Sequence, residues 1–250
     1  MARRPATESY GLTARGAART QNEDSFACFP DEGVHLVVDG MGGAACGDVA
    51  AALAVEAIHE GARSARAEGR SGRELLTSSI ERANLRILDE SMRDRRLLGM
   101  GATIAVSCVD EGAAHVGRVG DARVYRLRGE VLSLVTRPYS FIQGPLPPYE
   151  ELTPEELAEI ERESRGRALG LGSGAAVELV TEPLVEGDLH LLCSDGLYGA
   201  LTLEEIASIL MANAPRSLER TARGLVEEAL GRSGSESDDT TVVLVRIVTP

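Results

Sequence analysis

The chain has 250 residues, of which 43% are hydrophobic and 26% are charged, and its formal net charge is −13. This balance is typical of a globular protein and argues against a disordered or fibrous chain. The acidic excess argues against nucleic acid or an anionic membrane surface as the main partner, because both repel negative charge.

The cysteines and the apolar segments indicate the compartment. Four cysteines lie far apart without a C-x-x-C pair, which predicts buried free thiols and not a disulfide framework or a zinc site: Cys28, Cys46, Cys108 and Cys193. No apolar stretch has the length of a membrane span, and the N-terminus has no signal-peptide core. We therefore expect a cytoplasmic protein without a membrane anchor.

The first third of the chain predicts a polar start, one short strand and two helices. Residues 1–9 are polar and predict a frayed terminus. Residues 34–39 are an apolar run that ends in a glycine cluster. Residues 46–68 are alanine-rich and predict a helix with Val49, Leu53, Ala57 and Ile58 on its apolar face. A second helix begins at Ser71, whose capping-box partner is Glu74, and has a stripe of Leu76, Ile80, Ala83 and Ile87.

The middle and the end of the chain predict strands joined by hairpins, followed by more helices. Strands are expected at 103–109, 114–119, 123–127, 131–135, 176–181, 189–193 and 241–248. The turns at 110–112 and 128–129 have hairpin length, so their flanking strands are expected to pair antiparallel. Two helices lie between the last two strands. One is capped by Thr202 with Glu205 and has Leu203, Ile206, Ala207 and Leu210 on one side. The other begins near Ser217 and aligns Leu218, Ala222, Leu225, Val226 and Ala229.

This order of elements predicts an α+β fold. Helices that cover hairpin-linked strands favour two stacked antiparallel sheets with helices outside, a four-layer α-β-β-α sandwich, over a doubly wound parallel sheet. The segment at about 137–168 is rich in proline and contains one short helix capped at Thr153, so it is expected to be a flap inserted over the edge of the core. One domain over residues 1–250 is the expectation from length.

Acidic residues recur at the ends of the apolar strands or beside glycines. They are Glu23-Asp24, Asp39-Gly40, Asp195-Gly196 and Asp238-Asp239. Each of these alone is more often a turn or a cap than a functional site. Together they predict a rim of carboxylates, and Mg²⁺ and Mn²⁺ prefer such oxygen ligands. Two ions sharing a carboxylate can activate a water for attack on phosphorus.

Short motifs in a fixed order give these acids a family context. They are Arg19-Thr-Gln-Asn-Glu-Asp24, Val38-Asp-Gly-Met-Gly-Gly43, Gly99-Met-Gly-Ala-Thr103, Val119-Gly-Asp-Ala-Arg-Val-Tyr125, Arg167-Ala-Leu-Gly170, Leu192-Cys-Ser-Asp-Gly-Leu197 and Ser237-Asp-Asp-Thr-Thr-Val242. Each is weak alone, but their ordered combination is specific. The chain resembles the type 2C (PPM) family of metal-dependent Ser/Thr protein phosphatases, of the bacterial type, over nearly its whole length.

The resemblance implies a role for each candidate residue. Asp39 would bridge two metals, the carbonyl of Gly40 would bind the second, and Asp195 and Asp238 would complete the first. Glu23 and Asp24 would act near the second metal through water. Arg19 would grip the substrate phosphate with its planar fork, which makes Arg19 and Asp39 the candidate catalytic residues. Asp121, with Asp195, would hold a weaker third metal.

The implied chemistry is hydrolysis of phosphoserine and phosphothreonine on proteins. Water held between two Mn²⁺ or Mg²⁺ ions would attack phosphorus in line, while Arg19 offsets the charge on the phosphate oxygens. The partners would be phosphorylated proteins and a bacterial Ser/Thr kinase, and the enzyme would be a monomer. Cys193 and Ser194 adjoin Asp195, but no histidine lies near them in sequence, so a covalent mechanism ranks below the metal mechanism.

The sequence departs from the family pattern at a few positions. Met41 stands where some animal relatives have a histidine assigned as general acid, so the donor of the leaving-group proton is not identified. Arg137-Pro-Tyr-Ser140 replaces an Asp-His-Ser run, which bears on substrate choice. Asp239 replaces a common asparagine and either perturbs the adjacent metal or exchanges roles with Asp238. Two alternatives stay open: a regulatory or binding module with the same fold, and a phosphoesterase of small molecules or phosphotyrosine.

Overall fold

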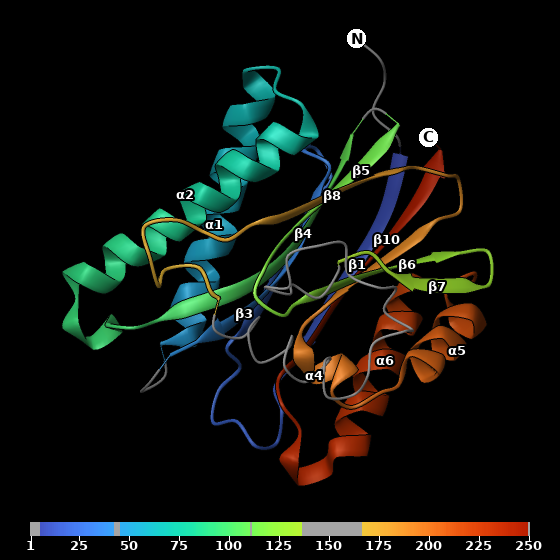
Figure 1. Cartoon of the computed structure of the whole chain (residues 1–250). Helices are drawn as coiled ribbons and strands as arrows, with labels where there is room; N and C mark the ends of the chain where they lie inside the picture. The colour runs from blue at the N-terminus through green and yellow to red at the C-terminus, as the bar shows by residue number, and fades with distance from the viewer. Residues whose placement is uncertain (1–5, 43–45, 111, 137–166, 250) are drawn as a thin grey trace, which may run out of the picture.

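The computed structural model describes residues 6–42, 46–110, 112–136 and 167–249. These residues form two five-stranded antiparallel sheets, as the hairpin spacing predicts (Figure 1). One sheet has the order β1-β10-β9-β6-β7, with bounds Ala6–Ala14, Thr240–Thr249, Leu189–Cys193, Arg123–Arg128 and Val131–Leu134. The other has the order β2-β3-β4-β5-β8, with bounds Asp24–Phe29, Val34–Met41, Gly101–Asp110, Ala113–Val119 and Glu178–Pro183.

Helices cover the outer face of each sheet. Helices α1 (Gly47–Ala67) and α2 (Gly72–Arg93) pack on the β2-β3-β4-β5-β8 sheet, and a 3-10 turn, η1 (Arg95–Leu97), follows α2. Helices α4 (Asp195–Tyr198), α5 (Leu203–Asn213) and α6 (Leu218–Ser233) lie on the side of the other sheet, and η3 (Gly234–Glu236) leads into β10. Figure 1 shows the two helical groups on opposite sides of the strands. The four-layer α-β-β-α prediction is confirmed.

The predicted helix caps are present. Ser71 and Thr202 each form a reciprocal capping box, with Glu74 and Glu205 respectively, and Ser217 accepts a hydrogen bond from the main chain of α6. These bonds satisfy main-chain N–H groups that a helix leaves unpaired in its first turn. The local sequence therefore fixes where three of the helices begin.

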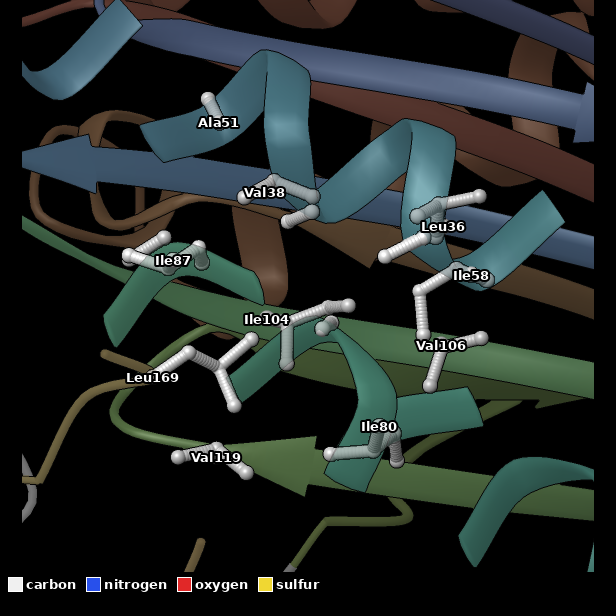
Figure 2. Close-up of a cluster of buried hydrophobic side chains, with 14 of the residues drawn as sticks. Leu36, Val38, Ala51, Ile58, Ile80, Ile87, Ile104, Val106, Val119 and Leu169 are labelled. Carbon is white, nitrogen blue, oxygen red and sulfur yellow. The ribbon is translucent and has the colours of Figure 1, made fainter. Parts of the chain in front are cut away.

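The core beneath α1 and α2 differs in one respect from its prediction. The α2 stripe of Leu76, Ile80, Ala83 and Ile87 is fully buried, as expected, and Figure 2 shows Ile80 and Ile87 of this stripe. On α1, however, Val49 and Leu53 are only half-buried, and the buried face is formed by Ala50, Ala51, Ala54, Ala57 and Ile58. Small side chains bring the helix axis close to its neighbours, so the alanine face and not the larger residues faces the packed layer.

The N-terminal strand corrects the prediction of a frayed start. Residues 6–9 belong to β1, which pairs antiparallel with β10 along its length from Ala14 opposite Thr240 to Ala6 opposite Thr249. The partner strand lies more than 200 residues away in sequence, so no local pattern could show the pairing. Polar residues are tolerated because β1 is an edge strand of its sheet.

Other predictions have mixed outcomes. None of the four cysteines forms a disulfide, and Cys28 is half-buried and the rest are buried, as predicted. Within the described residues, none of the helices is both long and apolar enough to cross a bilayer. The predicted flap at about 137–168, with its Thr153 cap, lies outside the described residues except for 167 and 168. The single-domain assignment of residues 1–250 stays a prediction.

Candidate metal centre

The antiparallel pairing of β2 with β3 places two carboxylates opposite each other. Asp24 begins β2, and its register partner is Asp39, near the end of β3. Asp39 is in turn paired with Thr103 on β4. Because the two strands are antiparallel, the start of β2 lies beside the end of β3. Two acids from separate motifs therefore lie at the same edge of the sheet, which we call the rim.

Three more aspartates reach this rim from other elements. Asp195 is the first residue of α4, directly after β9, Asp238 lies two residues before β10, and Asp121 lies in the crossing from β5 to β6. The pKa of Asp39 is raised well above its usual value, first by burial and then by repulsion from Asp24, Asp195, Asp121 and Asp238. The tertiary fold therefore gathers the predicted acids around Asp39.

Asp24 is held by hydroxyl groups of the other sheet. The Ser194 Oγ donates a hydrogen bond to Asp24 Oδ2 at 2.7 Å and accepts one from the main-chain N–H of Thr241 at 3.0 Å. Burial raises the pKa of Asp24 to about 7, and repulsion from Asp239 and Asp195 adds to it, although hydrogen bonds from Thr241 and Ser194 act in the opposite direction. Ser194 thus joins the two sheets at the rim.

Arg19 is the cation beside these acids. Its Nε donates to Asp238 Oδ1 at 2.5 Å and its Nη2 to Asp238 Oδ2 at 2.7 Å, while Nη1 lies 3.6 Å from Glu23 Oε2. The pKa of Arg19 is raised, mainly by the hydrogen bond to Asp238 and also by the charges of Asp239 and Asp39. The predicted phosphate-binding residue therefore lies at the acidic rim.

Gly40 is confined by the main chain around it. Its N–H donates to the carbonyl of Glu23 at 3.0 Å, and a Cβ at this position would lie 1.9 Å from the carbonyl oxygen of Gly47. The Glu23 Oε1 accepts a hydrogen bond from the N–H of Gly47 at 3.3 Å, at the start of α1. This start has no side-chain cap of its own from Cys46, so Glu23 supplies an acceptor there.

Asp239 occupies a position distinct from that of Asp238. It is only 4% exposed, and its two oxygens accept main-chain hydrogen bonds from Gly16 at 2.9 Å and from Glu23 at 2.8 Å. In this arrangement its carboxylate holds the loop between β1 and β2, while Asp238 faces Arg19. The exchange of metal-binding roles between Asp238 and Asp239 stays a prediction.

The covalent alternative has little support from the geometry. Cys193 is completely buried, and burial raises the pKa of its thiol to about 12. The Ser194 hydroxyl is also buried, and it donates to a carboxylate of high pKa. A nucleophile needs access to its substrate and a base that takes its proton, and neither side chain has the required exposure.

The oxygen donors of this site suit hard cations, although some of the acids already bind other side chains of the protein. Over residues 6–42, 46–110, 112–136 and 167–249, no three His, Cys, Asp or Glu side chains form a ready metal-binding group. Asp238 is engaged with Arg19 and Asp24 with Ser194. The cluster nevertheless consists of oxygen donors, and its mutual repulsion favours binding of positive charge. Both oxygens of Asp238 accept hydrogen bonds from Arg19, so Arg19 would compete with an ion there.

Sequence reasoning named the acids but missed what holds them. Ser237 accepts hydrogen bonds from the main chain of Ala17 and Ala18, through its Oγ at 2.8 Å and its carbonyl at 3.1 Å. Tyr198 donates to the carbonyl of Asp121 at 3.1 Å, and Arg123 lies 3.6 Å over the Tyr198 ring. A serine before two aspartates was the only local signal for the first of these contacts.

Comparison with known proteins agrees with this geometry. The family profile of stage II sporulation protein E (SpoIIE) matches residues 131–248. The serine/threonine phosphatase stp of Listeria monocytogenes is 29% identical over 238 residues, covering 93% of each chain. The serine/threonine protein phosphatase PstP of Mycobacterium tuberculosis is 32% identical over 240 residues, which are 94% of this chain and 44% of PstP.

A solved structure extends the likeness to the fold. The catalytic domain of PstP in complex with two manganese ions superposes with a TM-score of 0.79 at 28% identity, covering 97% of this chain and 98% of that domain. The two antiparallel sheets agree with this likeness. The chain belongs to the bacterial type 2C family of metal-dependent protein phosphatases.

Proposed function

We propose that this protein hydrolyses phosphoserine and phosphothreonine on proteins, with two divalent cations as cofactors. The observation that carries the proposal is the convergence of four aspartates from four separate segments around Asp39, with the Arg19 guanidinium beside them. Relatives of this chain are named serine/threonine phosphatases over nearly its whole length. A rim of this charge has no evident structural use, because its members repel one another.

The residues that would hold the cations are assigned as follows. Asp39, Asp195, Asp238 and the carbonyl of Gly40 are the proposed ligands of the two ions. Glu23 and Asp24 are proposed to act near the second ion through water. The pair Asp121 and Asp195 is the proposed site of a weaker third ion. All are oxygen donors, which Mn²⁺ and Mg²⁺ both accept.

The chain's own residues would bind and orient the phosphoryl group. When bound, two such cations would lower the pKa of a shared water and offset the charge of the phosphoryl oxygens. The Arg19 guanidinium has two parallel N–H donors, which now engage both oxygens of Asp238 and match two oxygens of a phosphate equally well. We propose that Arg19 passes from Asp238 to the substrate when a cation occupies Asp238.

The partners and the compartment are part of the proposal. Phosphoproteins produced by a bacterial Ser/Thr kinase are the proposed substrates, and Mg²⁺ is proposed as an alternative to Mn²⁺. Four cysteines that form no disulfide support a reducing compartment such as the cytoplasm. A monomer also remains our prediction, which light scattering of the purified protein tests.

The first test is metal-dependent turnover. Hydrolysis of p-nitrophenyl phosphate is measured with Mn²⁺, with Mg²⁺ and with excess EDTA, for the wild type and for Asp39→Asn and Asp195→Asn. The proposal expects turnover with metal, none with EDTA, and a loss of at least about 10²-fold in kcat in both variants. Absence of turnover with any divalent metal, from protein shown to be folded by circular dichroism, would contradict it.

The second test separates protein phosphatase activity from other phosphoesterase activity. Peptides phosphorylated on serine, threonine or tyrosine, otherwise identical, are compared with small phosphomonoesters by kcat/KM. Preference for phosphoserine and phosphothreonine peptides supports the proposal. Preference for phosphotyrosine or for the small esters would replace it with the corresponding phosphoesterase.

A further inference from the structure

The segment Ser237–Asp239 forms a cradle for the loop that joins β1 to β2. Ser237 accepts from the main-chain N–H groups of Ala17 and Ala18 at 2.8 and 3.1 Å. Asp239 accepts from those of Gly16 and Glu23 at 2.9 and 2.8 Å. The three residues just before β10 therefore alternate in their contacts. Ser237 and Asp239 bind the main chain of the loop, and Asp238 between them binds the Arg19 side chain.

The Asp239 carboxylate binds both ends of this loop. Gly16 lies at the beginning of the loop and Glu23 at its end, so one carboxylate ties together residues seven positions apart in sequence. The fit is close, since a Cβ on Gly16 would lie 2.2 Å from the carbonyl oxygen of Ser237. Main-chain donors held from both ends restrict the path of the residues between them.

Arg19 is one of the residues between these two anchors. Its guanidinium is on a long side chain, whose reach depends on where the main chain places its Cα. The side chain is 43% exposed, so packing around it contributes little to its position. The loop is also closed by the hydrogen bond from the N–H of Arg19 to the carbonyl of Gly16 at 3.2 Å. The main chain is therefore held on both sides of Arg19, at Gly16 and at Glu23.

We propose that Asp239, assisted by Ser237, is a positioning residue that fixes the main chain carrying Arg19 and so sets phosphate binding. The proposal rests on the function proposed above for Arg19. It assigns to Asp239 a role that requires no contact with metal or substrate. The two oxygens of a carboxylate both accept hydrogen bonds, which suits two N–H donors, whereas an asparagine offers one acceptor and one donor.

The chemistry predicts a graded series of variants. Asp239→Ala leaves two main-chain donors without their acceptor, the buried N–H of Gly16 and the part-buried N–H of Glu23, and Asp239→Asn retains an acceptor for one of them. With Mn²⁺ saturating for each variant, we expect KM for p-nitrophenyl phosphate to rise about 10-fold in Asp239→Ala and about 3-fold in Asp239→Asn, with a smaller change in kcat.

A double-mutant cycle distinguishes positioning from general stability. If Asp239 acts through Arg19, Asp239→Ala should change KM less than about 2-fold when Arg19→Ala is already present, because coupled residues are not additive. Asp110→Ala is the matched control. Asp110 accepts a main-chain hydrogen bond from Gly72 at 2.7 Å and pairs with Arg66 at 3.2 Å, away from the rim. This control should lower the thermal midpoint and leave KM unchanged.

A measurement without turnover keeps the inference independent of activity. Amide hydrogen exchange of the metal-free protein should accelerate at Gly16 and Glu23 by about 10-fold or more in Asp239→Ala, and at neither residue in Asp110→Ala. Unchanged exchange at both amides would overturn the cradle. Additive effects on KM, or an equal KM increase in Asp110→Ala, would overturn the positioning role. A wild type without turnover would instead contradict the proposed function, with the exchange result still decisive for the cradle.

Discussion

Arg19 and Asp238 form a two-point ion pair, with Nε to Oδ1 at 2.5 Å and Nη2 to Oδ2 at 2.7 Å. The two residues are 219 positions apart in sequence and come from the loop before β2 and the segment before β10. The pair joins the proposed phosphate ligand to a proposed metal ligand. In this pair Arg19 would compete with a cation for Asp238, and Asp238 would compete with the substrate phosphate for Arg19. Binding of a cation by Asp238 should therefore release Arg19.

Replacement of Arg19 should have opposite effects on substrate and metal. Arg19→Ala removes a two-point charged hydrogen bond to phosphate, worth about 3 kcal/mol, so kcat/KM should fall about 10²-fold. Mn²⁺ affinity measured by titration calorimetry should rise, because a competing cation is lost from Asp238. Arg19→Lys should be intermediate in kcat/KM, since it keeps the charge and loses the fork. Weaker Mn²⁺ binding in Arg19→Ala would contradict the competition.

Neutralising Asp39 should stabilise the metal-free protein. Burial and four neighbouring carboxylates raise its pKa, so its charge is unfavourable near neutral pH. In EDTA, Asp39→Asn should gain about 1–2 kcal/mol, seen as a higher thermal midpoint. In Mn²⁺ the order should reverse, because the wild type alone gains stability from tight ion binding.

Asp188→Asn is the matched control for this result. Asp188 is also buried, and burial acts to raise its pKa, but the hydrogen bonds from Arg128 and Val185 outweigh burial and lower it. Its neutralisation should therefore lower the thermal midpoint in EDTA and in Mn²⁺ alike. A lower thermal midpoint of Asp39→Asn in EDTA would contradict the repulsion among the carboxylates around Asp39.

Two buried histidines should make the fold sensitive to acid. Neither ring nitrogen of His35 has a hydrogen-bond partner, nor has Nδ1 of His190. Burial lowers the pKa of each to about 4. Repulsion by His190 lowers the pKa of His35 further. The charges of Arg126 and Arg128 lower the pKa of His190 further, whereas the charge of Asp188 acts to raise it. The unfolded chain binds these protons near pH 6.5, so stability should fall as pH decreases from about 6.5 to about 4.

The magnitude and the control follow from the same shift. Protonation of one histidine should lower the free energy of unfolding by on the order of 3 kcal/mol across this pH range. The two histidines interact, so their effects do not add. His35→Leu should flatten the decline, measured as the urea midpoint at pH 7 and pH 4.5 in EDTA, and should stabilise the protein at pH 7 by removing an unpaired polar group. An unchanged pH dependence in His35→Leu would assign the acid response to other groups.

Gly40 should tolerate no side chain. A Cβ there would lie 1.9 Å from the carbonyl oxygen of Gly47 and 2.7 Å from that of Glu23, and main-chain atoms cannot turn aside as a side-chain end can. Gly40→Ala should therefore lose activity at least about 10²-fold and lower the thermal midpoint, as overpacking does. Gly231→Ala, in α6 with no atom within 4 Å of the added carbon, should keep both. Wild-type behaviour of Gly40→Ala would contradict the close approach.

Much of the fold follows from local sequence. The capping boxes at Ser71 and Thr202 and the α2 stripe from Leu76 to Ile87 are short-range patterns, and each element formed as predicted. Hydrogen bonds and side-chain spacing within one helix depend on residues three or four apart, so the sequence alone contains the information. The ordered acidic motifs identified the family for the same reason, because each is a short string of residues.

Other features depended on segments that are distant in sequence. The pairing of β1 with β10 corrected the expected frayed start, and the buried face of α1 proved to be alanine, not Val49 and Leu53. The roles of Ser194 and Asp239 were also hidden, because their partners Asp24 and Gly16 lie 170 and 223 residues away.

The sequence by itself determined the starts of α2, α5 and α6, the hairpin-linked strands in the middle of the chain, the oxygen-donor chemistry and the family. Only the tertiary structure decided which acids meet, that Asp238 faces Arg19, and that Asp239 holds the loop. The physical reason is that repulsion among buried carboxylates and the satisfaction of buried main-chain donors arise only when strands from both ends of the chain are packed together.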